Sequence, residues 1–295
     1  MTDIAAIEFN SWRRLFDFGR SLGQTWFYRG QSDADWELTS SLERAIGVDH
    51  GDDWLWQHTE RWMLRKFQGF AHNYLAHPPA NDDRVEWLAL MQHHGAPTRL
   101  LDCTFSFPVA AYFAAWEAKS DFAIWAFNWN RFRLSLIDRF NLKLNDAFAA
   151  LEFHAEMHGK ANDFLSTPPI LSGAMAFPVV PPRANERLEA QQGLFLFPSD
   201  VARTLQENLQ CLVGPRTNIK TINERSSLVP YDTATHDPAK LHKHWLLKLM
   251  LPKIHRFEVV NDLHNMNIHE ASLFPGLDGF ARSLRRYTVR NGPNP

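Results

Sequence analysis

Apolar side chains recur at helical spacing along much of the chain, and short runs of aromatic or branched residues separate these stretches. The helical spacing predicts helices over 5–23, 53–76, 84–93, 106–118, 239–250 and 277–286. The short apolar runs predict strands over 25–30, 121–127, 194–197 and 256–260. The stretch 130–185 fits neither pattern, and its two Pro-Pro pairs mark loops.

This order of elements predicts one mixed α+β domain. We see no internal repeat and no low-complexity linker, and 295 residues suffice to bury a sizeable core. We therefore expect a single domain over residues 1–295, with a core at about 20–200 and a C-terminal α/β extension at about 235–290.

Charge and cysteine content narrow the functional classes. The formal net charge is −2, so a polyanion would have to bind at a local basic patch. One such patch closes the chain, where we predict a solvated helix face rather than a binding site; it consists of Arg282, Arg285, Arg286 and Arg290. Two cysteines give no disulfide framework. We found no signal peptide and no apolar run of membrane-spanning length, which favours a cytoplasmic protein with no membrane partner.

The first candidate site is the segment Tyr28-Arg29-Gly30, at the end of a predicted apolar strand. An arginine there is costly to bury unless its guanidinium meets an anion or a carboxylate. The glycine would let a ligand approach the backbone closely. The sequence leaves open whether Arg29 binds a ligand phosphate or pairs with a carboxylate of the protein.

The second candidate site is the segment 92–114, which concentrates polar groups between two predicted helices. Ser106 has a simple structural role as a helix cap. That role leaves His93, Arg99 and Asp102, together with Thr104, in need of partners.

The same segment argues against two kinds of chemistry. Adjacent histidines cannot share a helix face, and neither an HExxH nor a CxxC motif is present, so we predict no metal site. Ser106 lacks the Gly-x-Ser-x-Gly surroundings of a hydrolase nucleophile. Cys103 has only Arg99 as a nearby basic residue, which favours an inert core thiol.

The third candidate is the segment from Arg187 to Phe197, where Gln191 and Gln192 open an apolar strand. The alternative is a turn or β-bulge with exposed glutamines.

Together these segments resemble the FRG-domain family, which is named for an aromatic-Arg-Gly motif. The resemblance rests on residues 28–31, on Trp36, Leu38, Ser41 and Arg44, on the long stretch 92–114, on 187–195 and on 273–279. Cys103 stands where the family usually has Trp. The resemblance implies a toxin or phage-defence effector, with an antitoxin or defence-system partner.

A more remote resemblance is to ADP-ribosyltransferases, with their Arg–Ser–Glu pattern. It implies a split β-sheet core flanked by helices, NAD as cofactor, and a nucleic-acid or protein acceptor. Arg29 would hold NAD beside Tyr28 and the Gly30 backbone, and Thr104 or Ser106 would take the serine role. Gln191 and Gln192 stand where the glutamate is expected, so Asp102 or Glu189 would have to supply the negative charge.

Three functions therefore stay open. The first is an NAD-using enzyme of the ADP-ribosyltransferase type. The second is a nucleotide or nucleic-acid binding module that uses Arg29, His93 and Arg99 for phosphates and aromatic side chains for stacking. The third is a metal-independent nuclease or hydrolase with His93 as base and Asp102 as its orienting group.

Overall fold

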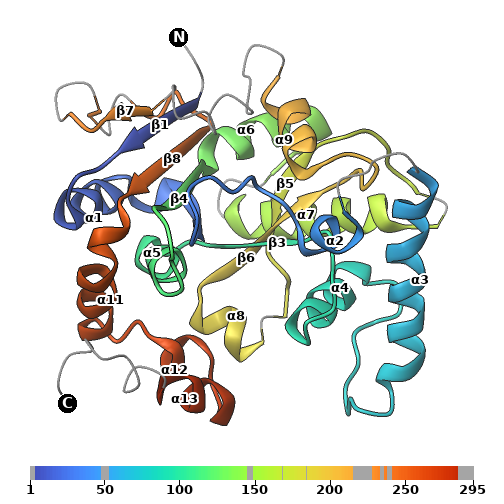
Figure 1. Cartoon of the computed structure of the whole chain (residues 1–295). Coiled ribbons are helices and arrows are strands. Elements are labelled where there is room, and N and C mark those ends of the chain that lie inside the picture. The colour runs from blue at the N-terminus through green and yellow to red at the C-terminus, as the bar shows by residue number, and fades with distance from the viewer. Residues whose placement is uncertain are drawn as a thin grey trace.

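The computed structural model describes residues 4–47, 53–144, 149–167, 169–183, 185–214, 228–232, 236–237 and 241–284. Its centre is a mixed sheet of eight strands in the order β5-β6-β3-β2-β4-β8-β1-β7 (Figure 1). The strands are β1 (Ile4–Glu8), β2 (Trp26–Gln31), β3 (Leu101–Thr104), β4 (Phe122–Asn128), β5 (Ala176–Val179), β6 (Gly193–Pro198), β7 (Leu228–Pro230) and β8 (Leu246–Leu251). Strands β1, β7 and β8 pair in parallel, and every other neighbouring pair is antiparallel.

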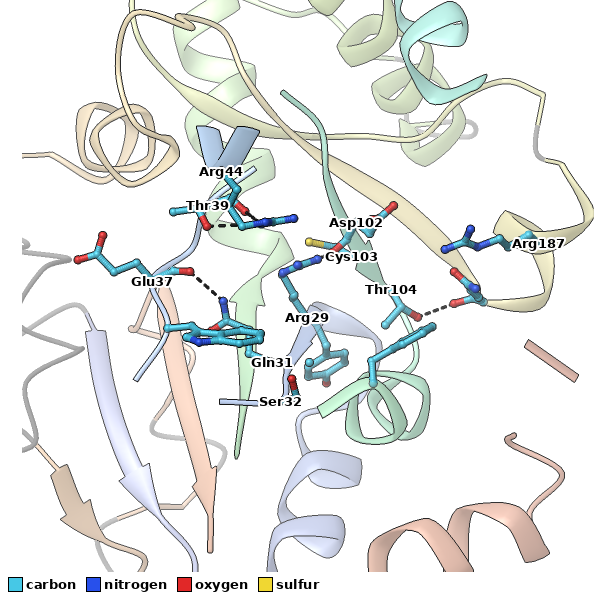
Figure 2. A pocket seen from close by; sticks show the side chains of 15 residues that line it. Arg29, Gln31, Ser32, Glu37, Thr39, Arg44, Asp102, Cys103, Thr104 and Arg187 are labelled. Atoms are coloured by element: carbon cyan, nitrogen blue, oxygen red, sulfur yellow. Dashed lines mark hydrogen bonds between the residues drawn. The ribbon is translucent and has the colours of Figure 1, made fainter. Parts of the chain in front are cut away.

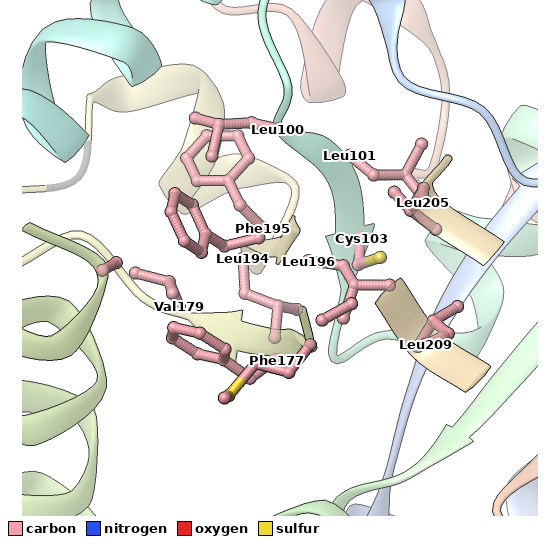
Figure 3. Close-up of a cluster of buried hydrophobic side chains, with 14 of the residues drawn as sticks. Leu100, Leu101, Cys103, Phe177, Val179, Leu194, Phe195, Leu196, Leu205 and Leu209 are labelled. Atoms are coloured by element: carbon pink, nitrogen blue, oxygen red, sulfur yellow. The ribbon is translucent and has the colours of Figure 1, made fainter. Parts of the chain in front are cut away.

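Helices cover both faces of this sheet. The face of β2 that carries Tyr28 packs against α1 (Trp12–Ser21), α5 (Phe107–Ala115) and α11 (Arg256–Asn265). The opposite face packs against α4 (Arg84–His93), α6 (Trp129–Phe140), α7 (Ala149–Leu165) and α9 (Leu205–Val213). Figure 3 shows the part of this second core that β3, β5, β6 and α9 build from interlocking leucine and phenylalanine side chains. The remaining helices are α2 (Ser41–Ile46), α3 (Asp53–Ala71), α8 (Glu186–Ala190), α12 (Glu270–Leu273) and α13 (Leu277–Ser283).

The sheet is nearly divided in two between β2 and β3. Strand β2 pairs with β4 along its whole length, from Trp26 to Gln31. Its ladder with β3, in contrast, consists of one residue pair, Tyr28 opposite Thr104. Beyond that pair the two strands diverge. Because diverging strands leave backbone groups and side chains without a neighbouring strand, this position can hold a ligand pocket.

The predicted α+β class is confirmed, and so are most elements predicted in the first two thirds of the chain. Strands β2, β4 and β6 and helices α3, α4 and α5 lie within a few residues of their predicted bounds. The ambiguous stretch 130–185 contains α6, α7 and β5. Among the described residues, no helix is both long enough and apolar enough to span a membrane.

Two predictions near the C-terminus were wrong. The first is the helix predicted over 239–250. Residues 246–251 form strand β8 instead, which lies between β4 and β1 and is buried on both faces. A short run buried on both faces has no polar side to reveal its period, so its apolar residues also fit a helix. The next segment, predicted as a strand, is helix α11. Its buried residues Val259 and Leu263 are four apart, as one helix face requires.

The predicted N-terminal helix over 5–23 was also partly wrong. Residues Ile4–Glu8 form β1, which pairs with β8, and the helix begins only at Trp12. Ser11 before it has an extended backbone, with φ −156°. The pairing partner of β1 lies some 240 residues further along the chain, so local spacing could not reveal the strand.

Candidate functional site

A pocket of about 610 Å³ lies where β2 and β3 diverge. Its volume falls within the range of small-molecule and cofactor sites. The walls come from β2, the following loop, β3 and the helices around them (Figure 2). The lining residues are Tyr28, Arg29, Gly30, Gln31, Ser32, Trp36, Glu37, Thr39, Arg44, Asp102, Cys103, Thr104, Phe113, Arg187 and Gln191.

Arg29 extends from β2 across the gap between the strands. Its Nη1 donates a hydrogen bond to the Asp102 carbonyl oxygen at 2.7 Å. Its Nε is buried and has no hydrogen-bond acceptor among the described residues. A buried donor without an acceptor costs about 1–3 kcal/mol, and more on a charged group. An anion that binds in the pocket beside Arg29 would interact favourably with the charge of this guanidinium.

Two further arginines and two carboxylates set the charge of the pocket. Burial lowers the pKa of Arg44, and the positive charge of Arg29 lowers it further, while Glu43 and Asp102 oppose the shift. Burial also lowers the pKa of Arg187, which Asp102 raises. Asp102 thus acts on arginines from both sides of the pocket. Three guanidiniums stand against the carboxylates of Asp102 and Glu37, so the lining favours an anionic ligand.

The loop between β2 and α2 supplies an aromatic wall. Trp36 is 55% exposed although it lines the pocket. The loop is fixed from below by Gln31, whose Nε2 donates to the Glu37 carbonyl oxygen at 3.0 Å and whose Oε1 accepts from Trp125 Nε1 at 2.6 Å. An open tryptophan face on a fixed loop is suited to stacking against a planar ring.

Lys248 lies beneath the same loop. Its ammonium group is 5.2 Å from the centroid of the Trp125 ring, on the adjacent strand. Burial lowers the pKa of Lys248 to about 8, although Asp35, Asp33 and Glu37 in the loop oppose the shift. The charge of Lys248 therefore favours a loop position that keeps these acidic residues close.

Tyr28 and Gly30 have mainly structural roles. The Tyr28 ring packs edge-on against Phe107 of α5, with centroids 5.4 Å apart. A Cβ on Gly30 would lie 2.0 Å from the Ala110 carbonyl oxygen and 2.6 Å from the Ala114 amide nitrogen. The sequence suggested that the glycine admits a ligand. The structure gives another reason for it: α5 packs directly on the β2 backbone.

The hydroxyls of Thr104 and Ser106 are both engaged within the fold. Thr104 Oγ1 donates to the Gln191 carbonyl oxygen at 2.7 Å and accepts from the Ser106 amide at 2.9 Å. Ser106 caps α5 by accepting from the Val109 amide at 3.4 Å. Thr104 lines the pocket and Ser106 does not. The capping role considered for Ser106 is confirmed.

Gln191 lies at the pocket, but its side chain points to the C-terminal helices. Its Nε2 donates to the Leu273 carbonyl oxygen at 3.0 Å. Gln192 follows with φ 47°, and its carbonyl oxygen accepts from the Phe105 amide. Glu189 is exposed on α8 and does not line the pocket. The carboxylates at the pocket are therefore those of Asp102 and Glu37.

The structure does not bring Arg99 to the pocket. Arg99 is 7% exposed, and its Nε donates to Glu60 Oε2 at 2.7 Å. Its Nη1 donates to the carbonyl oxygens of Pro198 and Ser199, and its guanidinium lies over the Phe197 ring. The proposed phosphate-binding role of Arg99 has no support in this geometry, because the fold already occupies the guanidinium.

His93 and Asp102 do not form a base–orienter pair. His93 is exposed at the end of α4 and packs edge-on against His94. Burial lowers the pKa of His93, as do the charges of His94 and Arg187. Asp102 Oδ1 instead accepts from Gln92 Nε2 at 2.7 Å. Within the described part of the chain, no group of three or more His, Cys, Asp and Glu side chains is placed to hold a metal ion.

Cys103 is a buried residue of the pocket wall. Burial raises the pKa of its thiol to about 12, so the thiolate is scarce at neutral pH. This agrees with the inert role predicted for Cys103.

Sequence reasoning overlooked several residues of the pocket. Trp36, Arg44 and Arg187 contributed to the family resemblance but received no role, and Glu37 and Phe113 were not singled out. The available signal was an arginine in each of three segments that carry the family resemblance, but only the fold shows that the three converge.

The fold and the site define a class: an α+β protein with an arginine-lined pocket at a break in its sheet. The family model of the FRG domain matches residues 24–122. The chain therefore carries an FRG domain, and this match contains β2, the loop after it and β3, which build most of the pocket. A search of curated proteins and a search of solved structures each returned no match.

Proposed function

We propose that the protein is an NAD-using enzyme of the ADP-ribosyltransferase type and that it binds NAD in this pocket. One observation carries the proposal: Arg29 stands at the break in the sheet with a buried Nε that has no acceptor. Arg44 and Arg187 reinforce it from either side. The resemblance to the FRG family adds the expectation of a toxin or phage-defence effector.

The lining fits a dinucleotide in its chemistry. Guanidinium groups match phosphate oxygens, and Arg29, with the nearby Arg44, would hold the diphosphate. Trp36 and Phe113 offer aromatic surface for a planar ring. When bound, NAD supplies an ADP-ribosyl group: nicotinamide leaves with the bonding electron pair, the acceptor forms the new bond with its own lone pair, and the acceptor gives up a proton.

Asp102 is the carboxylate that we assign to this chemistry. It lies between Arg29 and Arg187, and its Oδ1 is held by Gln92. A fixed carboxylate can stabilise positive charge that develops on the reacting sugar or accept the proton of the acceptor. Gln191 can do neither, because an amide carries no charge and its nitrogen is already bonded to Leu273.

Calorimetric titration of NAD into the purified protein tests the binding step. We expect Arg29→Ala to weaken NAD binding by about 10–100-fold, the loss typical of a hydrogen bond to a charged group. Arg13→Ala is the matched control, since Arg13 is exposed on α1. Wild-type protein that does not bind NAD, or an equal loss in both variants, would contradict the proposal.

Release of nicotinamide tests the chemical step. Asp102→Asn keeps the size of the side chain, so we expect NAD affinity within about threefold of wild type and a loss of turnover of about 100-fold or more. The assay needs acceptors of both classes, RNA or DNA and a protein lysate.

A second function, nucleotide binding without chemistry, has its own observation in favour. The carboxylate of the Arg–Ser–Glu pattern is replaced by Gln191, whose side chain serves the fold. This function predicts that NAD binds through Arg29 and is recovered intact, with Asp102→Asn indistinguishable from wild type in every assay.

A further inference from the structure

Two arginines share one aromatic ring at the edge of the pocket. The guanidinium carbon of Arg187 is 4.7 Å from the centroid of the Phe274 ring, and that of Arg282 is 5.5 Å from the same centroid. Because both guanidinium carbons contact the same ring, the distance between them is at most the sum of these two distances. Phe274 in turn contacts Phe113 of the pocket wall, with centroids 6.0 Å apart.

Neither guanidinium forms a hydrogen bond or a salt bridge within the described part of the chain, although the negative charge of Asp102 acts on Arg187. Burial lowers the pKa of Arg187, Asp102 opposes this shift, and the positive charge of Arg282 adds to it. The fold thus holds two cations close together, on a ring that restricts how they can point.

We propose that Arg187 and Arg282 form a phosphate-binding subsite for the backbone of a single-stranded nucleic acid, which presents the acceptor group to the pocket. This inference rests on the proposed function and names its substrate class. Arg187 belongs to the pocket lining, whereas Arg282 is exposed outside it on α13. A ligand that contacts both must continue from the pocket to the surface, as a polynucleotide does.

The charges favour phosphodiesters over an acidic peptide. Arginine presents a planar fork that binds two oxygens of one phosphate. The adjoining pocket also offers the faces of Trp36 and Phe113, on which a base at the end of the strand can stack. Because the chain as a whole is slightly negative, binding must depend on these few local cations.

A fluorescent single-stranded oligonucleotide, titrated at several salt concentrations, tests the subsite without NAD. We expect Arg282→Ala to weaken binding by about 10-fold and to lower the slope of log affinity against log salt by about one. Arg282→Lys should lose less, and NAD affinity should be unchanged. Arg139→Ala is the matched control, because Arg139 is exposed on α6.

Four outcomes would overturn the subsite. The oligonucleotide does not bind; the control variant loses as much as Arg282→Ala; Arg282→Ala weakens NAD or pyrophosphate binding instead; or polyglutamate competes as well as the oligonucleotide. Oligonucleotide binding that depends on Arg282, in a protein that does not bind NAD, would support the subsite and refute the proposed function alone.

Discussion

Arg29 and Arg99 stand in two different segments of the sequence, and they differ in how the fold satisfies a guanidinium that is half-buried in Arg29 and buried in Arg99. Arg99 has a complete set of partners: the Glu60 carboxylate and the carbonyl oxygens of Pro198 and Ser199. Arg29 donates to one carbonyl oxygen, that of Asp102, and its Nε has no acceptor among the described residues. The comparison indicates that an arginine with few hydrogen-bond partners in the fold is the better candidate for binding a ligand.

The surroundings of the two residues explain the contrast. Arg99 lies where α3 and the end of β6 close over it, and it is only 7% exposed. Arg29 lies where β2 and β3 part, which exposes one side of its guanidinium to the pocket. The first arginine should therefore matter for stability and the second for binding.

The largest expected effect comes from breaking the Arg99–Glu60 pair. Arg99→Ala leaves the Glu60 carboxylate buried without its partner, so we expect the free energy of unfolding to fall by about 3–5 kcal/mol. Chemical denaturation measures this loss directly. Arg29→Ala, measured in the same way, should cost about 1 kcal/mol or less, because Arg29 makes one hydrogen bond that the fold can use.

A double variant serves as the control for this prediction. Arg99→Met combined with Glu60→Leu replaces the ion pair with apolar groups, and such replacements are often close to neutral. If the double variant were as unstable as Arg99→Ala, the loss would come from packing or from the carbonyl oxygens of Pro198 and Ser199 that lose their donor, rather than from an unpaired charge. An Arg29→Ala variant as unstable as Arg99→Ala would abolish the contrast between the two arginines.

The sequence could show which residues were unusual but not which ones meet. Arg99 finds Glu60 39 positions away, and Arg29 finds the Asp102 carbonyl oxygen 73 positions away. No local sequence pattern predicts a contact between residues so far apart in the chain. Most helices and strands of the first half were predictable from helical spacing or from short aromatic runs. Strand β4 is buried on both faces, as β8 is, but its aromatic residues favour a strand, whereas the leucines of β8 also fit a helix.

Only part of the basic patch at the end of the chain lies within the described residues. Arg282 lies in α13 beside Phe274, whereas Arg285, Arg286 and Arg290 lie outside the described residues. The sequence pattern favoured a solvated face for this helix. It could not show that Arg282 packs on the ring of Phe274, the C-cap residue of α12, at the edge of the pocket. That contact depends on how α12 and α13 are oriented relative to each other.

Gly30→Ala tests whether the glycine of the motif serves the fold or the ligand. The new Cβ would meet backbone atoms of α5, which cannot move aside as a flexible side chain can. We expect a loss of about 1–3 kcal/mol in the free energy of unfolding. Gly69→Ala in α3 is the control, because nothing lies within 4 Å of its Cβ and alanine favours the helix. A stable Gly30→Ala protein that had lost only NAD binding would restore the ligand role.

Ser106→Ala should have the smallest effect. It tests whether the Ser106 hydroxyl serves the stability of the fold, as Arg99 does, or the chemistry of the site. Ser106 caps α5 through a hydrogen bond of 3.4 Å, which is long, so the loss should lie near the lower end of the 0.5–2 kcal/mol typical of N-caps. Ser106→Asn preserves a capping side chain and should recover most of that stability. NAD binding and nicotinamide release should be unchanged in both variants, because Ser106 lies outside the pocket lining. If Ser106→Asn were stable but inactive, the hydroxyl would have a chemical role, and Ser106 would belong with Arg29 rather than with Arg99.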